Sequence, residues 1–425
     1  MLMLSVCKVE KAGYWHKMVI AMILFAFLII GGFGQGAVAA EKGPIKIGFI
    51  ATTTGIFGQL GIDMISGIRM ALDENNNMIA GRKVEMIVED EQNPQVAVTK
   101  ARKLIAHDKV HFIAGVLISP AAYAISPICE EAKIPFFDTQ ASGDDLTQRK
   151  RTKYTIRLAQ TAGEAGHVAG DFTYRKLGWK KANIIAFDYA WGHESAGGFQ
   201  RVFEDAGGQV IQKVWVPINA MDFGPYVAGL NREADGVFDN VTGAASIRLT
   251  KLLREGAKPW EVIGNGPLTD ETMHEALGQA CVGVYSSWPY SIALQLPQTV
   301  KWKERARRYL GREPNGYTMM QYSCIDWIIR AIKKVNGNVE DKEKFLNAVR
   351  SMEIPDSIRG PLKLDKYGEP IQNYYIRRLD KIGEGYQNTV VETYPNVSQF
   401  WKYDPEEFLK QPVYSRDYPP CKFCK

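Results

Sequence analysis

Cysteine and histidine are scarce in this sequence, and the motifs of familiar enzymes are missing. The 425 residues include 6 Cys and 6 His, and they do not form the full ligand set of a zinc site. There is no G-x-S-x-G elbow, no H-E-x-x-H motif and no P-loop. Gly55, Gly58 and Gly61 follow the first predicted strand without the spacing of a dinucleotide fingerprint. These absences favour a binding protein over an enzyme, and we expect no cofactor and no metal site.

A strong net charge is also missing. The formal charge is +5, 23% of the residues are charged, and no block of Lys or Arg stands out. This balance argues against a nucleic-acid partner. The hydrophobic fraction of 46% is ordinary for a folded protein, and the length suggests two or three domains.

Long apolar runs are absent except near the N-terminus. Three lysines precede an apolar run over residues 18–30, and small residues follow at 37–40. This order is typical of a signal peptide, which we place at residues 1–40. The alternative is a membrane anchor, but the run of 13 residues is shorter than the roughly 20 that span a bilayer. We therefore expect an exported, periplasmic protein with no membrane span after cleavage.

Five cysteines remain after the predicted cleavage site. Cys129 and Cys324 lie in apolar helical patterns, which predict buried thiols. Cys421 and Cys424 stand three apart in a proline-rich tail, without a second pair or a nearby histidine. This spacing favours a local disulfide, or a bridge from one of them to Cys281, over a zinc site.

Short β-rich runs alternate with helical patterns along the chain, and the alternation restarts near residue 160. This order predicts an α/β fold with parallel sheets in two successive units. The predicted strands of the first unit are 45–50, 84–88, 111–118 and 134–137, and those of the second are 182–187, 209–216, 236–239 and 261–263. Further helices are predicted at 163–176, 244–255, 300–310 and 318–335, and late strands at 360–365 and 373–377.

The loops that follow the strands are the candidate ligand site, because ligands of open parallel sheets bind beyond the carboxyl ends of the strands. The loops concerned are 52–61, 117–120, 138–144, 188–194, 239–243 and 264–270. Four aromatic residues would add apolar walls to such a cleft: Phe57, Trp191, Trp288 and Tyr290. Hydroxyl and N–H donors beside aromatic rings suit a ligand with a carboxylate head and an apolar body.

Two loops offer anion-binding groups. Ser119 before Pro120 has the pattern of a helix N-cap. The Ser119 hydroxyl and the neighbouring amides would bind an anion, or the serine would only cap the helix. Ala141 and Ser142 follow the fourth strand and offer further N–H groups. The adjacent pair at 144–145 is interpreted as surface charge.

The order and spacing of several segments resemble the solute-binding proteins of branched-chain amino acid ABC importers, the Leu/Ile/Val-binding type of periplasmic binding protein. The similarity covers roughly residues 44–380. The segments that carry it are 45–50, 90–97, 115–120, 141–147 and 154–158.

The resemblance implies a type I periplasmic binding fold, in which two Rossmann-like lobes are joined by three crossovers and close over a ligand by a hinge. We place the crossovers near residues 160, 290 and 375. The first lobe would then comprise 44–160 and 290–375, the second 161–289 and 376–400, and an irregular tail 401–425. The implied partners are a small-molecule ligand and an inner-membrane ABC permease, and we expect a monomer.

Some positions of this sequence keep the ligand-binding groups that the resemblance implies. Ser119, Ala141 and Ser142 fall where the family binds the carboxylate of its ligand. Trp191 falls at the second-lobe tyrosine that covers the ligand.

Other positions depart from the family. The acidic residue that binds the α-ammonium group in the family corresponds to Gly266 here. The two tyrosines that contact the side chain of the family's ligand correspond to Leu60 and to a position near Thr242. An ammonium group buried without a carboxylate is unfavourable by several kcal/mol. We therefore expect an aromatic or hydrophobic carboxylate that lacks an α-amino group.

Three alternatives stay open at this point. One is a sensory binding protein that serves a chemoreceptor or kinase. A second is a binder of amino acids or amides, for which Asn240 and Asn265 supply donors. The third is an exported α/β enzyme.

Overall fold

The computed structural model describes residues 42–424. The predicted signal peptide at 1–40 lies outside the described residues. Within 42–424, no helix is both long and apolar enough to cross a membrane.

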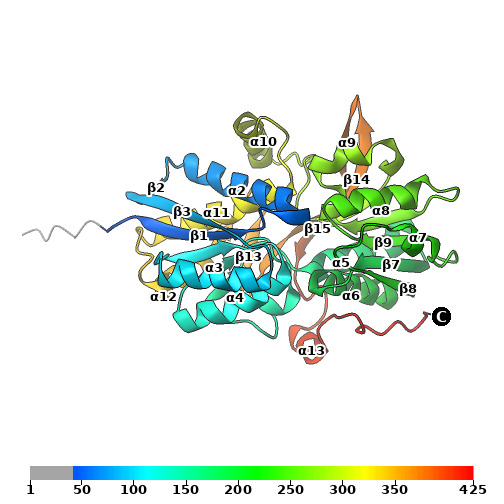
Figure 1. The fold of residues 1–425 in the computed structure, drawn as a ribbon, viewed down its shortest axis with the longest axis horizontal. Coiled ribbons are helices and arrows are strands. Elements are labelled where there is room, and N and C mark those ends of the chain that lie inside the picture. Colours follow the sequence, from blue (N-terminus) through cyan, green and yellow to red (C-terminus); the bar gives the residue numbers. More distant parts are fainter. Residues whose placement is uncertain (1–41, 425) are drawn as a thin grey trace, which may run out of the picture. The chain divides into compact units, whose positions relative to one another are not determined.

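Six strands form the first sheet, in the order β2–β3–β1–β4–β5–β6 (Figure 1). Five of them are parallel, and the short edge strand β2 is antiparallel to β3. The bounds are β1 (Ile45–Ala51), β2 (Met78–Ile79), β3 (Arg82–Asp90), β4 (Phe112–Gly115), β5 (Phe136–Asp138) and β6 (Thr155–Arg157).

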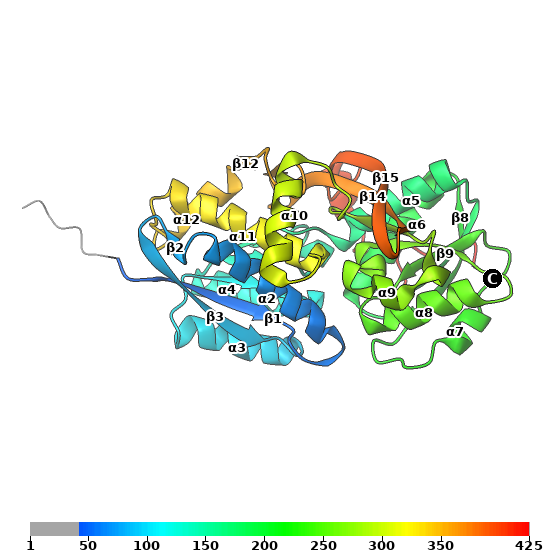
Figure 2. The ribbon, with the colours of Figure 1, turned by 90° about the horizontal axis from the view of Figure 1, so that it is seen from above.

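Helices cover both faces of this sheet (Figure 2). Ile47 and Phe49 of β1 belong to the core on one face, whereas Ile50 belongs to the core on the other, because successive side chains of a strand alternate. The helices on the first of these faces are α2 (Gly58–Asp73), α11 (Gly316–Lys334) and α12 (Lys342–Arg350), and those on the second are α3 (Pro94–Ala106) and α4 (Ser119–Ala132).

Nine strands form the second sheet. Its parallel part has the order β8–β7–β9–β10–β11, and β14 continues it antiparallel to β11. The bounds are β7 (Lys181–Phe187), β8 (Gln209–Val216), β9 (Gly236–Asn240), β10 (Glu261–Asn265), β11 (Tyr285–Trp288), β12 (Glu353–Ile354), β13 (Leu362–Leu364), β14 (Pro370–Ile382) and β15 (Gly385–Val397).

The second sheet is also covered on both faces. Ile184 of β7 packs with α5 and α6, and the neighbouring Ile185 packs with α8. A capping box of Thr161 and Glu164 fixes the start of α5. The helices are α5 (Ala162–Phe172), α6 (Ala190–Asp205), α7 (Gly224–Ala228), α8 (Ala244–Glu255) and α9 (His274–Leu277).

The chain passes between the lobes more than once. After β6 it enters the second sheet, after β11 it returns through α10 (Pro297–Leu310) to α11 and α12, and it then re-enters the second sheet. The predicted boundaries near 160, 290 and 375 remain a proposal. Short turns complete the element order: η1 (Gly55–Phe57), η2 (Asp144–Leu146), η3 (Thr173–Leu177), η4 (Gly266–Thr269), η5 (Glu271–Met273) and η6 (Gln279–Cys281).

The predicted elements differ from the structure at particular points. β8 and α8 have the bounds that the sequence predicts. The strand predicted at 111–118 ends at Gly115, because Gly115 and Val116 adopt φ values of +105° and +70°, which no strand contains. The prediction also misses β15, which forms a long hairpin with β14.

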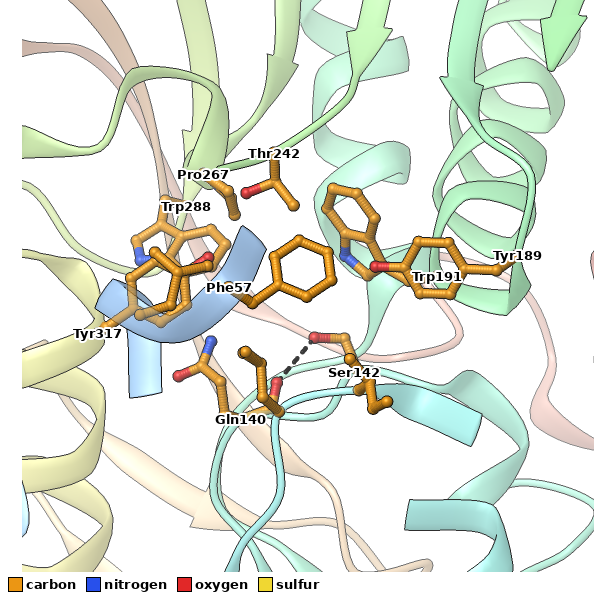
Figure 3. Close-up of a pocket in the computed structure, with 12 residues that line it drawn as sticks. Phe57, Gln140, Ser142, Tyr189, Trp191, Thr242, Pro267, Trp288 and Tyr317 are labelled. Atoms are coloured by element: carbon orange, nitrogen blue, oxygen red, sulfur yellow. Dashed lines mark hydrogen bonds between the residues drawn. The ribbon is translucent and has the colours of Figure 1, made fainter. Parts of the chain in front are cut away.

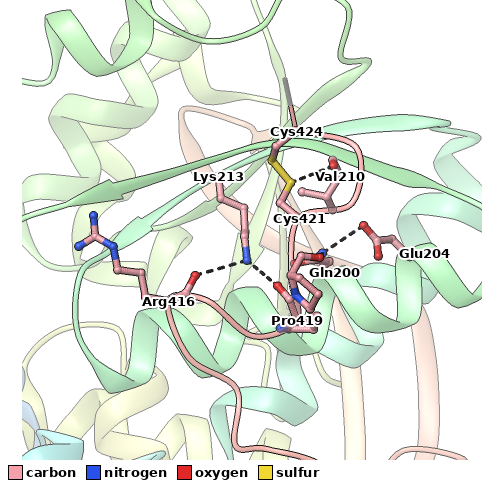
Figure 4. Close-up of a disulfide and its surroundings, with 9 residues drawn as sticks. Gln200, Glu204, Val210, Lys213, Arg416, Pro419, Cys421 and Cys424 are labelled. Atoms are coloured by element: carbon pink, nitrogen blue, oxygen red, sulfur yellow. Dashed lines mark hydrogen bonds between the residues drawn. A yellow bond between two sulfur atoms is a disulfide. The ribbon is translucent and has the colours of Figure 1, made fainter.

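The C-terminal tail contains a short helix, α13 (Pro405–Lys410), within the segment predicted as irregular. Cys421 and Cys424 form the local disulfide, which was one of the two alternatives, and Cys281 is a free, buried thiol. Cys421 lies against the carbonyl of Val210 on β8, and the side chain of Lys213 donates to the carbonyl of Pro419 (Figure 4). The tail is thus fastened to the edge of the second sheet.

Candidate functional site

A cavity lies where the loops at the carboxyl ends of the two sheets meet (Figure 3). We call it the inner cavity, and its free volume is ≈ 30 Å³. All six loops that the sequence indicated supply at least one wall residue. The wall consists of Phe57, Leu60, Leu117, Ile118, Gln140, Ser142, Tyr189, Trp191, Thr242, Pro267, Trp288 and Tyr317.

Four of the predicted site residues line the inner cavity. Phe57 ends the turn η1, and Ser142 lies in the loop after β5. Trp191 belongs to the first turn of α6, and Thr242 lies between β9 and α8. Because each comes from a different loop, the cavity depends on both lobes being in place.

The other four predicted residues are buried outside this wall. They are Ser119, Ala141, Asn240 and Asn265. The Ala141 N–H donates to the carbonyl of Val116, and the Asn265 side chain donates to Ser195 Oγ at 2.6 Å. Within residues 42–424, the side-chain amide of Asn240 has no hydrogen-bond partner. Their contact with a ligand remains a prediction.

The N-cap role predicted for Ser119 is wrong. Helix α4 begins at Ser119, its N-cap is Ile118, and no side chain caps it. The N–H groups of Leu117 and Ile118 instead donate to the buried carboxyl group of Glu91, at 2.8 and 2.9 Å. Burial raises the pKa of Glu91 to about 7. The amides expected to hold a ligand anion are therefore satisfied by a side chain of the protein itself.

Aromatic rings dominate the wall, and sequence analysis identified only part of them. Trp288 lines the cavity as expected, whereas Tyr290 is buried elsewhere. Tyr189 and Tyr317 were not singled out. Tyr189 pairs with Trp191 at a centroid distance of 6.0 Å, and Tyr317 pairs with Trp288 at 6.3 Å. Only the start of α11, far along the chain from the predicted loops, brings Tyr317 to the site.

The polar groups of the wall are neutral donors and acceptors. Gln321 Nε2 donates to Gln140 Oε1 at 3.4 Å, which leaves the amide nitrogen of Gln140 directed into the cavity (Figure 3). Ser142 donates from its hydroxyl to the backbone carbonyl of Gln140 at 3.1 Å. No wall residue has a charged side chain. The site can therefore hydrogen-bond an anion, but it offers no carboxylate to a cation.

A buried acidic contact joins the two lobes beside the cavity. Glu194 of α6 accepts hydrogen bonds from the Asp144 N–H and the Tyr123 hydroxyl, each at 2.8 Å. Asp144 also accepts from the Gly163 N–H. Asp144 and Asp145 are almost fully buried, so their interpretation as surface charge is wrong. Burial raises the pKa of Asp144 to about 7 and that of Glu194 well above its ordinary range.

Asp239, at the end of β9, supports a prediction about pH. It is fully buried and accepts from the Val241 N–H and the Thr250 hydroxyl. Burial raises its pKa from 3.8 to about 8. The folded state therefore keeps a proton that the unfolded state releases, so stability falls as pH rises from about 4 to 8.

The Asp239→Asn variant removes this titration. We expect the free energy of unfolding of the wild type to fall with pH more steeply than that of the variant, by about 1 kcal/mol per pH unit between pH 6 and 8. Urea titrations at several pH values measure both slopes. Asp417→Asn, at an exposed position, is the matched control. Equal slopes for the wild type and Asp239→Asn would contradict the prediction.

Comparison with known proteins identifies the family. The sequence profile described as periplasmic binding protein matches residues 44–385. The chain belongs to this family. Leu/Ile/Val-binding protein homolog 6 of Brucella melitensis is 27% identical over 368 residues, which cover 83% of this chain and 92% of that protein. The resemblance stated from the sequence is confirmed.

Solved structures agree with the two-lobed α/β fold. An ABC transporter substrate-binding protein from Sphaerobacter thermophilus has a TM-score of 0.79 and 31% identity, covering 83% of this chain and 98% of that one. A second similar structure is a solute-binding protein of an ABC transporter from Rhodopseudomonas palustris BisB5, solved in complex with 3,4-dihydroxybenzoic acid. It has a TM-score of 0.79 and 27% identity, and the match covers 84% of this chain and 98% of that one. The predicted type I periplasmic binding fold is therefore confirmed.

Proposed function

We propose that this periplasmic binding protein captures a small aromatic carboxylate without an α-amino group and delivers it to an ABC permease. The ligand lies between the lobes in this proposal, and the permease is in the inner membrane. Its place of action is the periplasm, which it reaches by the signal peptide predicted at residues 1–40. It acts by binding and release, without catalysis.

The uncharged, aromatic wall of the inner cavity carries the proposal. Five of its residues have aromatic rings, and none has a charged side chain. An α-amino acid would bury its ammonium group without a counter-ion, which is unfavourable by several kcal/mol. An aromatic acid has no such group, and its ring gains from burial against Trp191 and Trp288.

Neutral donors suffice for the carboxylate end. The Gln140 amide nitrogen faces the cavity and supplies the donor, whereas the neighbouring Ser142 hydroxyl already donates to the Gln140 backbone carbonyl (Figure 3). Hydrogen bonds from neutral donors to an ionised acceptor contribute about 1.5–3 kcal/mol each. The 3,4-dihydroxybenzoic acid bound by the R. palustris protein supports the same ligand class.

Calorimetric titration tests the proposal. We expect the purified protein to bind 4-hydroxybenzoate and 3,4-dihydroxybenzoate and to show no heat of binding with leucine. The Gln140→Leu variant should bind these acids about 10- to 100-fold more weakly, because one donor to the carboxylate is lost.

Gln295→Leu makes the same substitution at an exposed position outside the cleft, and we expect wild-type affinity from it. Tight binding of leucine would refute the proposed ligand class. Wild-type affinity in Gln140→Leu would refute the proposal that Gln140 binds the carboxylate group of the ligand.

A further inference from the structure

A second space adjoins the inner cavity, and Phe57 separates the two. We call it the outer chamber, and its free volume is ≈ 360 Å³. Phe57, Ile118 and Tyr189 line both spaces. The remaining wall of the outer chamber is mostly apolar and includes Pro120 and Ile218.

The inner cavity is too small for an aromatic ligand while Phe57 keeps its position. An engineered protein cavity that binds benzene has a volume of about 150 Å³, whereas the inner cavity has ≈ 30 Å³. Figure 3 shows the ring of Phe57 in the middle of the wall residues, between the indoles of Trp191 and Trp288. The side chain thus fills the space that a ligand ring would use.

The ring of Phe57 has an apolar place to move to. Its side chain is 7% exposed and has only carbon and hydrogen atoms, so no hydrogen bond fixes it. Rotation into the outer chamber keeps the ring beside Ile118 and Pro120 and places it near the exposed Ile56 and Ile218, so part of the apolar burial is retained. Gly55, two residues before it, has a φ of +70°, and Gly58 follows it directly.

Phe57 also lies close to the opposite lobe. A Cβ atom added at Gly243 would lie 3.5 Å from Cδ1 of Phe57, so the ring faces the loop between β9 and α8. Because Phe57 itself belongs to the first lobe, its ring bridges the cleft. Movement of this one side chain therefore changes both the room for a ligand and the contact between the lobes.

We propose that Phe57 is the gate and the size-determining residue of the cleft, whose ring turns into the outer chamber when the ring of the ligand enters the inner cavity. This inference rests on the proposed function. With the Phe57 ring in the outer chamber, that chamber is closed to the ligand, and the site takes single-ring acids. Without the ring, the two spaces become continuous and accept two-ring acids.

The test compares Phe57→Ala with the wild type, using 4-hydroxybenzoate as the single-ring acid and 2-naphthoate as the two-ring acid. Stopped-flow tryptophan fluorescence gives the association rate constants, and calorimetry gives the affinities. We expect the variant to bind 4-hydroxybenzoate about tenfold faster, because the closed gate no longer reduces the binding-competent fraction. We also expect it to bind 2-naphthoate, which the wild type rejects.

Phe423→Ala, in the disulfide loop of the tail, makes the same substitution outside the cleft and should behave like the wild type. Circular dichroism verifies that each variant is folded. The gate is refuted if the wild type binds 4-hydroxybenzoate but Phe57→Ala neither binds it faster nor gains 2-naphthoate. If neither acid binds to either protein, the proposed function itself has failed.

Discussion

Replacing Arg157 by methionine should lower the free energy of unfolding by about 3–5 kcal/mol, because it leaves the buried Asp138 carboxylate without its counter-ion and removes hydrogen bonds to two backbone carbonyls. Arg157 is fully buried at the end of β6. Its guanidinium group contacts Asp138 at 2.9 Å and Glu369 at 3.0 Å. Burial raises the pKa of Asp138 to about 6 and that of Glu369 to about 8, even with Arg157 present.

The same substitution should abolish ligand binding. Arg157 also donates to the backbone carbonyls of Ala141 and Gly143, so it holds the loop that carries Gln140 and Ser142. Without these hydrogen bonds the Gln140 amide, the proposed donor to the ligand carboxylate, loses its position. Urea denaturation and calorimetric titration of the variant measure the two effects separately.

Two further variants make the test specific. Arg157→Lys keeps the charge but not the planar guanidinium group with its several donors. Its free energy of unfolding should lie between that of Arg157→Met and that of the wild type. Arg151→Met removes an exposed guanidinium group and should change stability by less than about 0.5 kcal/mol. An Arg157→Met variant with the urea midpoint of the wild type would show that the buried network contributes little.

Adding one methyl group at Gly266 should damage both the fold and the site. A Cβ atom there would overlap the indole ring of Trp288, which forms part of the wall of the inner cavity. Overpacking of this kind is unfavourable by about 1–3 kcal/mol. We expect Gly266→Ala to displace Trp288, to lower the melting temperature and to weaken binding of 4-hydroxybenzoate.

Gly256→Ala is the matched control, because the atom nearest to its added methyl group lies 3.9 Å away. We expect it to keep the melting temperature and the affinity of the wild type. Thermal denaturation and intrinsic tryptophan fluorescence follow the two variants. Unchanged fluorescence and affinity in Gly266→Ala would contradict the proposed packing of Trp288.

This packing gives a physical reason for the departure at Gly266. The resemblance places there the acidic residue that holds an α-ammonium group in the family. In this protein the indole of Trp288 occupies the space beside Gly266. A larger side chain at position 266, a carboxylate included, and the indole of Trp288 cannot share that space.

Elements with a strong local pattern were predicted well. The helix α8 begins and ends at the predicted residues, because Gly243 precedes its apolar face and Gly256 follows it. By contrast, β4 was predicted too long, since the apolar run continues past the point where Gly115 and Val116 leave the extended conformation. A run of apolar residues does not specify where its backbone turns.

The sequence by itself determined the α/β fold, the family and the six loops that surround the cavity, because strand and helix periodicities and the order of loops are local properties of the chain. Only the tertiary structure decided which side chains of those loops face inward. In the folded protein, Glu91 accepts hydrogen bonds from the backbone amides that were expected to bind the ligand, Asp144 is buried, and Tyr317 of α11 lines the cavity. These outcomes depend on contacts between segments far apart in the chain, which no local pattern encodes.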